Sequence, residues 1–388
     1  NEFGKVVLIG ANTPRFDHDP VTRESKGLLI EESRTNSWTY SQPTSAAAFG
    51  ANGTFTYEAA TAPNGKTEAF RLANNPASSS NSYHRATRAI TFGSDAMVLS
   101  VWAKGENNNN YFIWSFQNLG GAIVRAGFKL EGDGETSIIT NGNGGHTLQI
   151  EKYPDGWYRC IIIGNTDSSG STTQYLYSAS GYSESSSATG GSTLLWGFQL
   201  EVGSFATSYI PTGSAAVTRG ADIALLDDIE SEMGYNQLEG TVITDFSYTQ
   251  DDDGAQTIFA FSGTEADPDA SGPRQWLRVN QSAGTPNTIR YSMTNGGTST
   301  STDSTATATA GVFQKFAFAY EAGDQDLSLN GTSILDTAKT PATDIFRLVF
   351  GNIGWNLGLE STSLEGHIKR FMYYPKKLSN SQLNTLTS

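Results

Sequence analysis

The residues of this sequence that could do chemistry are aromatic and polar side chains alternating along a predicted strand. In the stretch QWLRVN, the two-residue period of a strand places Leu277 and Val279 on one face. The opposite face carries Trp276, Arg278 and Asn280. An aromatic ring can stack on the flat C–H face of a sugar, while guanidinium and amide groups hydrogen-bond to its hydroxyls. We therefore predict that this face binds carbohydrate; the alternative is that Trp276 packs against a loop or another domain.

A second aromatic group, in the first half of the chain, could bind sugars in the same way. The stretch YFIWSFQ, which supplies two of its rings, is apolar on both faces. The stretch QYLYSA supplies the other two. The predicted sugar-binding residues of this group are Tyr111, Trp114, Tyr175 and Tyr177.

Aspartate-rich loops offer oxygen ligands for a metal. Asp251 and Asp253 lie in the run DDDG, and Asp267 and Asp269 flank a proline. Carboxylate oxygens from loops are the ligands that Ca²⁺ prefers. A Ca²⁺ site is one hypothesis for these residues, and solvated polar turns are the alternative. No other pattern in the sequence requires a cofactor.

Patterns typical of catalytic sites are absent from the sequence. The four histidines include no pair at i,i+4 spacing and suggest neither zinc nor a His-based triad. Glycoside hydrolysis needs two carboxylates across a cleft, but in the doublets Glu31-Glu32 and Asp227-Asp228 adjacent strand residues face opposite sides. No glycine pair has the strand–loop–helix context of a phosphate site. We predict no catalytic residue, and whether the protein is an enzyme stays open.

Short strands separated by turns must position the predicted binding residues. Glycine makes up 41 of 388 residues and charged residues only 16%, which is typical of many strands joined by Gly, Ser, Asn and Asp turns. The chain is longer than one core usually supports. We predict an all-β fold of two tandem antiparallel β-sandwich (jelly-roll) domains with an extended N-terminal arm. The expected divisions are the arm at 1–40, a jelly roll at 41–212, a connection with a short helix or turn at 213–237, and a second jelly roll at 238–388.

Charge and hydropathy argue against several classes of protein. The net charge is −14 and no Lys/Arg cluster is present, so nucleic acid is not an expected partner. No apolar run is long enough to insert into a membrane. Cys160 is the only cysteine, which rules out a disulfide within the chain. We recognise no signal peptide, and we expect the chain to be a C-terminal fragment of a longer protein.

Two long motifs resemble a module of bacteriophage tail-fibre, tail-spike and head-spike proteins. Residues 14–36 read PRFDHDPVTRESKGLLIEESRTN, and residues 194–222 read LLWGFQLEVGSFATSYIPTGSAAVTRGAD. In that module an extended segment precedes a carbohydrate-binding-like jelly roll, which ends in the second motif. The resemblance implies a virion protein, made in the host cytoplasm and exposed on the virion tail or capsid, with other virion proteins as partners. It also implies a homo-oligomer, with a trimer favoured. Residues 1–36 are expected to pack as an extended arm on the first domain or on a neighbouring subunit, because the apolar trio at 28–30 lies between turn-rich stretches.

Residues 238–388 resemble laminin-G-like and concanavalin-like jelly rolls. The resemblance rests on GVFQKFAFAYEAGDQDLSLNGTSI and on the ending GHIKRFMYYPKKLSNSQLNTL. Phe313 stands where those domains usually have tryptophan. Laminin-G-like domains often carry Ca²⁺, which the resemblance therefore implies as a possible ligand.

Three functions remain open from the sequence. The first is a phage virion adhesin that binds host cell-surface polysaccharide without cleaving it. The second is a polysaccharide depolymerase, a glycoside hydrolase or lyase, which would need clustered acids or a Tyr/His/Arg group in a groove. The third is a structural virion protein without a ligand. A glycan array followed by an assay for released reducing ends would separate the three.

Overall fold

A computed structural model of the chain describes most of its residues. These are all residues except 44–48, 52–53, 74–84, 93–95, 118–122, 143–144, 166–169, 184–190, 250–254, 264–272, 281–286, 296–297, 338–339 and 353–362. Strands dominate and the helices are short, which confirms the predicted all-β fold. No helix in this described part has the length and apolar character needed to cross a membrane.

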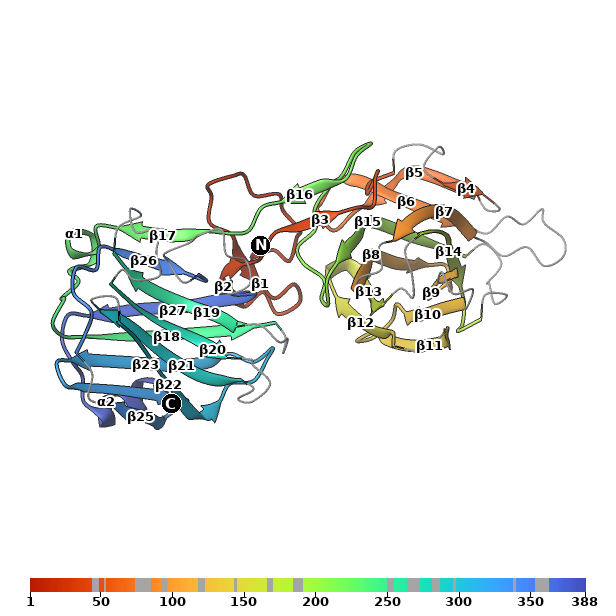
Figure 1. Cartoon of the computed structure of the whole chain (residues 1–388). Coiled ribbons are helices and arrows are strands. Elements are labelled where there is room, and N and C mark those ends of the chain that lie inside the picture. Colours follow the sequence, from red (N-terminus) through yellow and green to blue (C-terminus); the bar gives the residue numbers. More distant parts are fainter. Residues whose placement is uncertain are drawn as a thin grey trace. The chain divides into compact units, whose positions relative to one another are not determined.

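The chain divides into two compact units, each built as an antiparallel β-sandwich (Figure 1). The units are discontinuous in sequence. Unit 2 begins before the main body of unit 1 and resumes after it, so that most of unit 1 is inserted into the sequence of unit 2. Unit 1 comprises residues 1–8, 19–23 and 34–219, and unit 2 comprises residues 9–18, 24–33 and 220–388.

Unit 1 consists of two six-stranded sheets and a short strand pair. The first, called the β9 sheet, has the order β11 (Glu135–Asn141), β10 (Ile123–Lys129), β9 (Tyr111–Gln117), β14 (Gly170–Ala179), β7 (Arg85–Phe92) and β4 (Gly50–Ala51). The second, called the β8 sheet, has the order β12 (Thr147–Lys152), β13 (Tyr158–Asn165), β8 (Ala96–Glu106), β15 (Ser192–Val202), β6 (Thr67–Ala73) and β5 (Thr54–Thr61). The separate pair consists of β3 (Arg34–Asn36) and β16 (Val217–Arg219).

The core of unit 1 lies between its two sheets and is rich in aromatic rings. Trp38 stacks on Phe198 with ring centroids 4.7 Å apart and meets Trp114 edge-on at 5.8 Å. β15 bulges at Gly197, where φ is +70° and an added Cβ would lie 2.9 Å from the Trp102 ring. The glycine of the WGFQLE motif is therefore required by the backbone geometry.

Asn36 joins the two long sequence motifs within unit 1. Its side chain is fully buried. Its Nδ2 donates hydrogen bonds to the backbone oxygens of Phe198 at 3.1 Å and Ile210 at 2.8 Å. Its Oδ1 accepts from the backbone nitrogens of Trp38 and Leu200, both at 3.0 Å. This residue of the first motif thus fixes the backbone of the second.

Unit 2 contains a seven-stranded and a six-stranded sheet, most strands of which are labelled in Figure 1. The first, called the β18 sheet, has the order β1 (Phe16–His18), β2 (Ser25–Ile30), β27 (Gly366–Tyr374), β18 (Gly240–Tyr248), β23 (Gln314–Glu321), β24 (Asp324–Leu329) and β25 (Thr332–Thr337). The second, called the β20 sheet, has the order β17 (Ala224–Asp227), β26 (Arg347–Phe350), β19 (Ala255–Ser262), β20 (Arg274–Asn280), β21 (Thr288–Asn295) and β22 (Thr298–Thr307).

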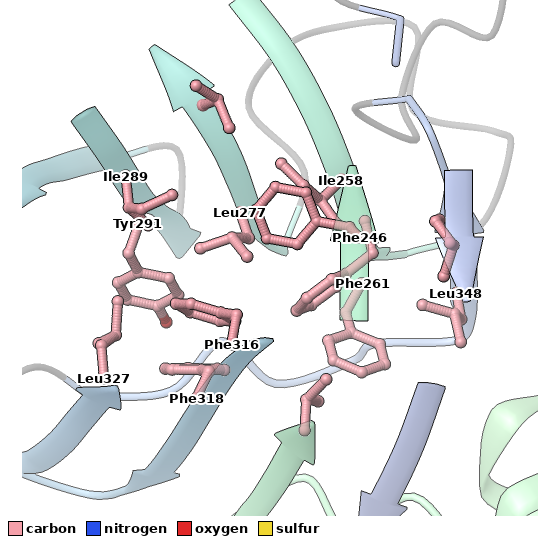
Figure 2. Packing of buried hydrophobic residues seen from close by; sticks show 14 of the residues in the cluster. Phe246, Ile258, Phe261, Leu277, Ile289, Tyr291, Phe316, Phe318, Leu327 and Leu348 are labelled. Atoms are coloured by element: carbon pink, nitrogen blue, oxygen red, sulfur yellow. The ribbon is translucent and has the colours of Figure 1, made fainter. Parts of the chain in front are cut away.

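Side chains from both sheets interdigitate in the core of unit 2. Figure 2 shows Phe316 and Phe318 of β23 approaching Tyr291 of β21 and Leu277 of β20. The rings of Tyr291 and Phe318 lie 4.5 Å apart. The alternate residues of β20 and β21 face away from this core, so the sheet has an outer face on which other residues can act.

The strand β2 of the N-terminal arm completes the β18 sheet. Leu28 pairs with Ile368 and Ile30 pairs with Gly366 of β27, and Ile30 is almost fully buried in the core of unit 2. The prediction that residues 1–36 pack on the first domain or on a neighbouring subunit is therefore wrong for this trio, whereas residues 1–8, 19–23 and 34–36 belong to unit 1. An apolar run of three residues signals burial, but it does not say which of two sandwiches buries it.

Arg15 links the N-terminal arm to the beginning of segment 220–388 of unit 2. Its Nη1 lies 2.6 Å from Glu31 Oε2, and its Nη2 pairs with Asp222. The carboxylate of Asp222 also accepts a hydrogen bond from the backbone nitrogen of Glu31 at 2.9 Å. Burial opposes ionisation, but the two carboxylates outweigh it and raise the pKa of Arg15. These residues belong to the two long motifs. Contacts between the motifs therefore hold together segments that are far apart in the sequence.

Two helices and one hairpin complete the description of unit 2. The predicted helix or turn after residue 222 is the strand β17 followed by the helix α1 (Ile229–Met233). The helix α2 (Asn380–Leu386) begins with a capping box at Ser379. Asn330 and Gly331 have φ of 48° and 80° and join β24 to β25 in a tight hairpin, as an Asn-Gly pair commonly does.

Candidate functional site

The outer face of the β20 sheet carries the first predicted binding group. Leu277 and Val279 are buried in the core of unit 2, so the alternate positions of β20 lie on the outer face. Arg278 is half-buried there. The backbones of Trp276 and Asn280 place these residues on the same face, but their side chains are not among those described. The predicted division of faces is found in the strand, and glycan contact by these residues stays a prediction.

Two arginines and one aspartate form a charged group on this face. Arg278 pairs across the strands with Arg290 of β21, which in turn pairs with Asp303 of β22. Asp303 accepts hydrogen bonds from Nε and Nη2 of Arg290, both at 2.6 Å. These hydrogen bonds and the arginine charges lower the pKa of Asp303. Burial and the charge of Arg290 lower the pKa of Arg278, which Asp303 partly offsets.

Two further arginines of the same face are buried. Arg274 of β20 is 3% exposed and pairs across the strands with Ser262 and Thr294. Arg347 of β26 is 5% exposed and donates from Nε to Asp227 Oδ1 at 2.5 Å. The described part of this face is therefore rich in guanidinium groups, although the net charge of the whole chain is −14.

The outer face of the β9 sheet carries Tyr111, Tyr175 and Tyr177 of the second predicted group together with Tyr182, and these four residues are here called the tyrosine face. The rings of Tyr175 and Tyr177 stack with centroids 6.5 Å apart, and those of Tyr111 and Tyr182 meet edge-on at 4.9 Å. Three of the rings are half-buried, and Tyr177 is 4% exposed. The structure thus brings three of the four predicted residues of this group together on one surface.

Trp114 does not belong to the tyrosine face. It lies in the core between the two sheets of unit 1, with no exposed surface. Its Nε1 donates to Gln174 Oε1 at 2.8 Å. Its assignment to glycan binding is therefore corrected, since a ring inside the core offers no face to a surface ligand. Tyr111 and Trp114 are three residues apart in β9, so strand alternation alone places their rings on opposite faces.

Tyr182 was not predicted from the sequence and follows β14 in a bend. Its ring covers Gly127 of β10, where an added Cβ would lie 2.6 Å from Cδ1 of the ring. Burial raises the pKa of its hydroxyl, helped by the nearby Glu135. A strand period could not reveal this residue, because it lies outside a strand. The glycine opposite it in β10 was the available signal for a close approach.

Polar residues accompany the tyrosine face. Ser115 of β9 lies between Arg125 of β10 and Tyr175 of β14 in the cross-strand order. Arg125 is half-buried. Rings for stacking and groups for hydrogen bonds to hydroxyls therefore occur on one sheet face, which is the combination that sugar binding requires.

One residue of each acidic doublet forms an ion pair with a buried or half-buried arginine. Glu31 pairs with Arg15, and Asp227 pairs with Arg347. A separate polar cavity of about 350 Å³ lies beside α1. Its carboxylates are Asp228, Glu230 and Asp344.

The predicted Ca²⁺ ligands lie outside the described residues. This applies to Asp251, Asp253, Asp267 and Asp269. Within the ranges that are described, no group of three or more His, Cys, Asp or Glu side chains is arranged to hold a metal ion. The Ca²⁺ hypothesis therefore stays a prediction.

Comparison with known proteins gives structural likenesses without a family. No family model and no curated protein matches the chain. One similar solved structure is the CBM40 module of the Ruminococcus gnavus IT-sialidase bound to alpha2,3 sialyllactose, with 16% identity, a TM-score of 0.35, and coverage of 42% of this chain and 91% of that chain. Another is the LG1-3 region of the laminin alpha2 chain, with 10% identity, a TM-score of 0.32, and coverage of 76% and 66%. A third is CG-16, a homodimeric agglutinin from chicken liver, with 11% identity, a TM-score of 0.28, and coverage of 39% and 100%.

These likenesses concern the fold alone. Carbohydrate-binding-module, laminin G and lectin-like domains are the kinds of β-sandwich to which the chain is similar. None of the three is a phage protein. The chain itself is a protein of two antiparallel β-sandwich units.

Proposed function

We propose that this protein is an adhesin of a phage virion that binds host cell-surface polysaccharide without cleaving it. The observation that carries the glycan-binding part is the tyrosine face of unit 1, with Arg125 and Ser115 on the same sheet face. The virion setting is supported by the resemblance of the two long motifs to phage fibre and spike modules. The absence of a recognised catalytic pattern supports binding without cleavage.

A shallow face of this kind should bind weakly at each site. Few rings and few hydrogen bonds contact each sugar, so we expect dissociation constants on the order of micromolar to millimolar. A homo-oligomer, with a trimer favoured, would present several copies to one glycan chain. Simultaneous binding would then raise the avidity by roughly 10²–10⁴.

A glycan array tests the proposal directly. The wild-type protein should bind at least one cell-surface polysaccharide, and Tyr175→Ala should weaken that binding about tenfold, because one stacking ring is lost. Tyr374→Ala is the matched control, since this exposed tyrosine lies on β27 of unit 2 and is not part of the tyrosine face. Equal binding by Tyr175→Ala and wild type would remove the tyrosine face as the site. Failure to bind any glycan would favour the structural virion protein.

The polar cavity beside α1 supports a second candidate, a polysaccharide depolymerase. Glycoside hydrolysis uses a pair of carboxylates, and Asp228, Glu230 and Asp344 line that cavity. Wild-type protein would then release reducing ends from the glycans that it binds. The double variant Glu230→Gln/Asp344→Asn should abolish that release while binding persists. No release by the wild type would reject this candidate.

A further inference from the structure

Arg278 is a charged side chain whose environment lacks a matching negative charge. Asp303 directs both of its carboxylate oxygens to the neighbouring Arg290. In the described part of the chain, the buried Nε of Arg278 has no hydrogen-bond partner. Arg278, Arg290 and Asp303 together carry one net positive charge.

This arrangement is unfavourable without a ligand. A buried N–H donor without a partner loses its hydration and gains no bond in return. Two guanidinium groups on directly opposed strand positions also repel each other, and Asp303 can neutralise only one of them. An anion placed against Arg278 would relieve both effects.

A planar carboxylate is the anion that best fits a guanidinium. The guanidinium presents its N–H donors as a rigid fork, which matches the two oxygens of a carboxylate. The same strand places Trp276 and Asn280 on either side of Arg278 by sequence position, two residues away in each direction. Residues of types that stack on a sugar ring and bind its hydroxyls therefore flank the cation on one sheet face.

We propose that Arg278, supported by the Arg290–Asp303 pair, binds the carboxylate of an acidic sugar within the host polysaccharide. The inference rests on the proposed glycan binding but concerns a separate surface, on unit 2. It assigns the charge class of the sugar, which the tyrosine face does not. The role of the Arg290–Asp303 pair is to hold the neighbouring positive charge in place while leaving Arg278 available.

The test uses four acidic polysaccharides, each beside its carboxyl-reduced form. The probes are polygalacturonate, hyaluronan, alginate and polysialic acid, and reduction replaces the carboxylate by a neutral alcohol. The full-length protein should bind at least one acidic form about tenfold more tightly than its reduced form. Arg278→Gln should abolish that preference. Lys315→Gln is the charge-matched control, because this exposed lysine lies on β23 of the other sheet of unit 2.

A second variant separates the local pair from the overall charge. Arg290→Gln/Asp303→Asn removes the ion pair without changing the net charge, and it should weaken binding of the acidic form by several-fold. Thermal melting should be recorded for each variant, so that loss of binding is interpreted only for folded protein. If Arg278→Gln does not fold, Arg278→Lys serves instead; it keeps the charge, loses the planar fork, and should reduce the preference.

The outcomes distinguish this inference from the proposed function. Equal binding of acidic and reduced forms, with Tyr175→Ala still weakened, would overturn the carboxylate site and leave glycan binding intact. A preference that survives in folded Arg278→Gln would also overturn it. Binding of sulfated dextran alone would assign the site to sulfate and reject a carboxylate. No binding to any acidic or neutral glycan would reject both proposals.

Discussion

Replacing Asn36 by aspartate tests whether the hydrogen bonds of this side chain, which link the two long motifs, stabilise unit 1. Asn36→Asp preserves the size of the side chain and both hydrogen bonds accepted by Oδ1. It replaces the two N–H donors, so that the buried carbonyl oxygens of Phe198 and Ile210 face a carboxylate. Each lost bond with an unsatisfied buried acceptor costs about 1–3 kcal/mol. We therefore expect unit 1 to lose about 4 kcal/mol of stability at neutral pH.

The loss should depend on pH with a defined sign. Burial and the two carbonyl oxygens would raise the pKa of the introduced carboxyl in the folded state above its unfolded value of about 4. Folded protein then binds the proton more tightly than unfolded protein. The destabilisation should therefore be smallest below about pH 4 and should grow as the pH rises through the folded-state pKa. A protonated carboxyl can also donate one of the two missing hydrogen bonds.

Urea denaturation followed by tryptophan fluorescence measures this effect. Five of the seven tryptophans belong to unit 1, so the signal reports mainly on that unit. With a slope of about 2 kcal/mol per molar urea, the midpoint should fall by about 2 M. Thr35→Ala is the matched control, because its hydroxyl contacts Thr218 at the exposed surface and should contribute less than about 1 kcal/mol. A midpoint for Asn36→Asp equal to that of Thr35→Ala would refute the reasoning.

Three further predictions follow from the described contacts. Deleting residues 1–33 removes β1 and β2 from the β18 sheet and should lower the melting temperature of unit 2, as measured by calorimetry; an unchanged temperature would contradict the pairing with β27. Burial raises the pKa of Asp17, but its hydrogen bond at 2.9 Å and its attraction to His367 outweigh this and lower it, so the stability that this pair contributes should be present above about pH 4 and lost at lower pH. Asp17→Asn should remove that part of the acid dependence in a pH series of urea midpoints. Gly127→Ala should displace the Tyr182 ring and reduce glycan binding at constant melting temperature, and unaltered binding would exclude this ring from the site.

Local patterns in the sequence predicted the strands well. The stretch YFIWSFQ is β9, and the Asn-Gly pair at 330 and 331 joins two strands, which is typical of this pair. Both features depend only on neighbouring residues, through side-chain alternation and left-handed backbone angles. The partner of β2 could not be predicted in this way, because its pairing with β27 joins segments at opposite ends of the chain.

The binding groups were predictable only in part, for the same physical reason. Alternation placed Arg278 on the outer face of its strand, and the structure adds that Arg290 and Asp303 lie beside it on the next two strands. Strand order decides such neighbours, and sequence spacing does not. Trp114 was misassigned because it was grouped with Tyr111, from which an odd spacing of three residues separates it onto the opposite face of β9, and Tyr182 was missed because it lies outside a strand and has no side-chain period.

The insertion of unit 1 into unit 2 has a consequence for synthesis on the ribosome. Asp17 and its partner His367 are separated by 350 residues. At about 5–20 residues per second, the hairpin of β1 and β2 must wait roughly 20–70 s for the strand that completes its sheet. A two-stranded hairpin is barely stable alone, so it remains open during this interval while unit 1 can fold. Translation speed and chaperone access over this period should therefore govern the yield of unit 2 far more than that of unit 1.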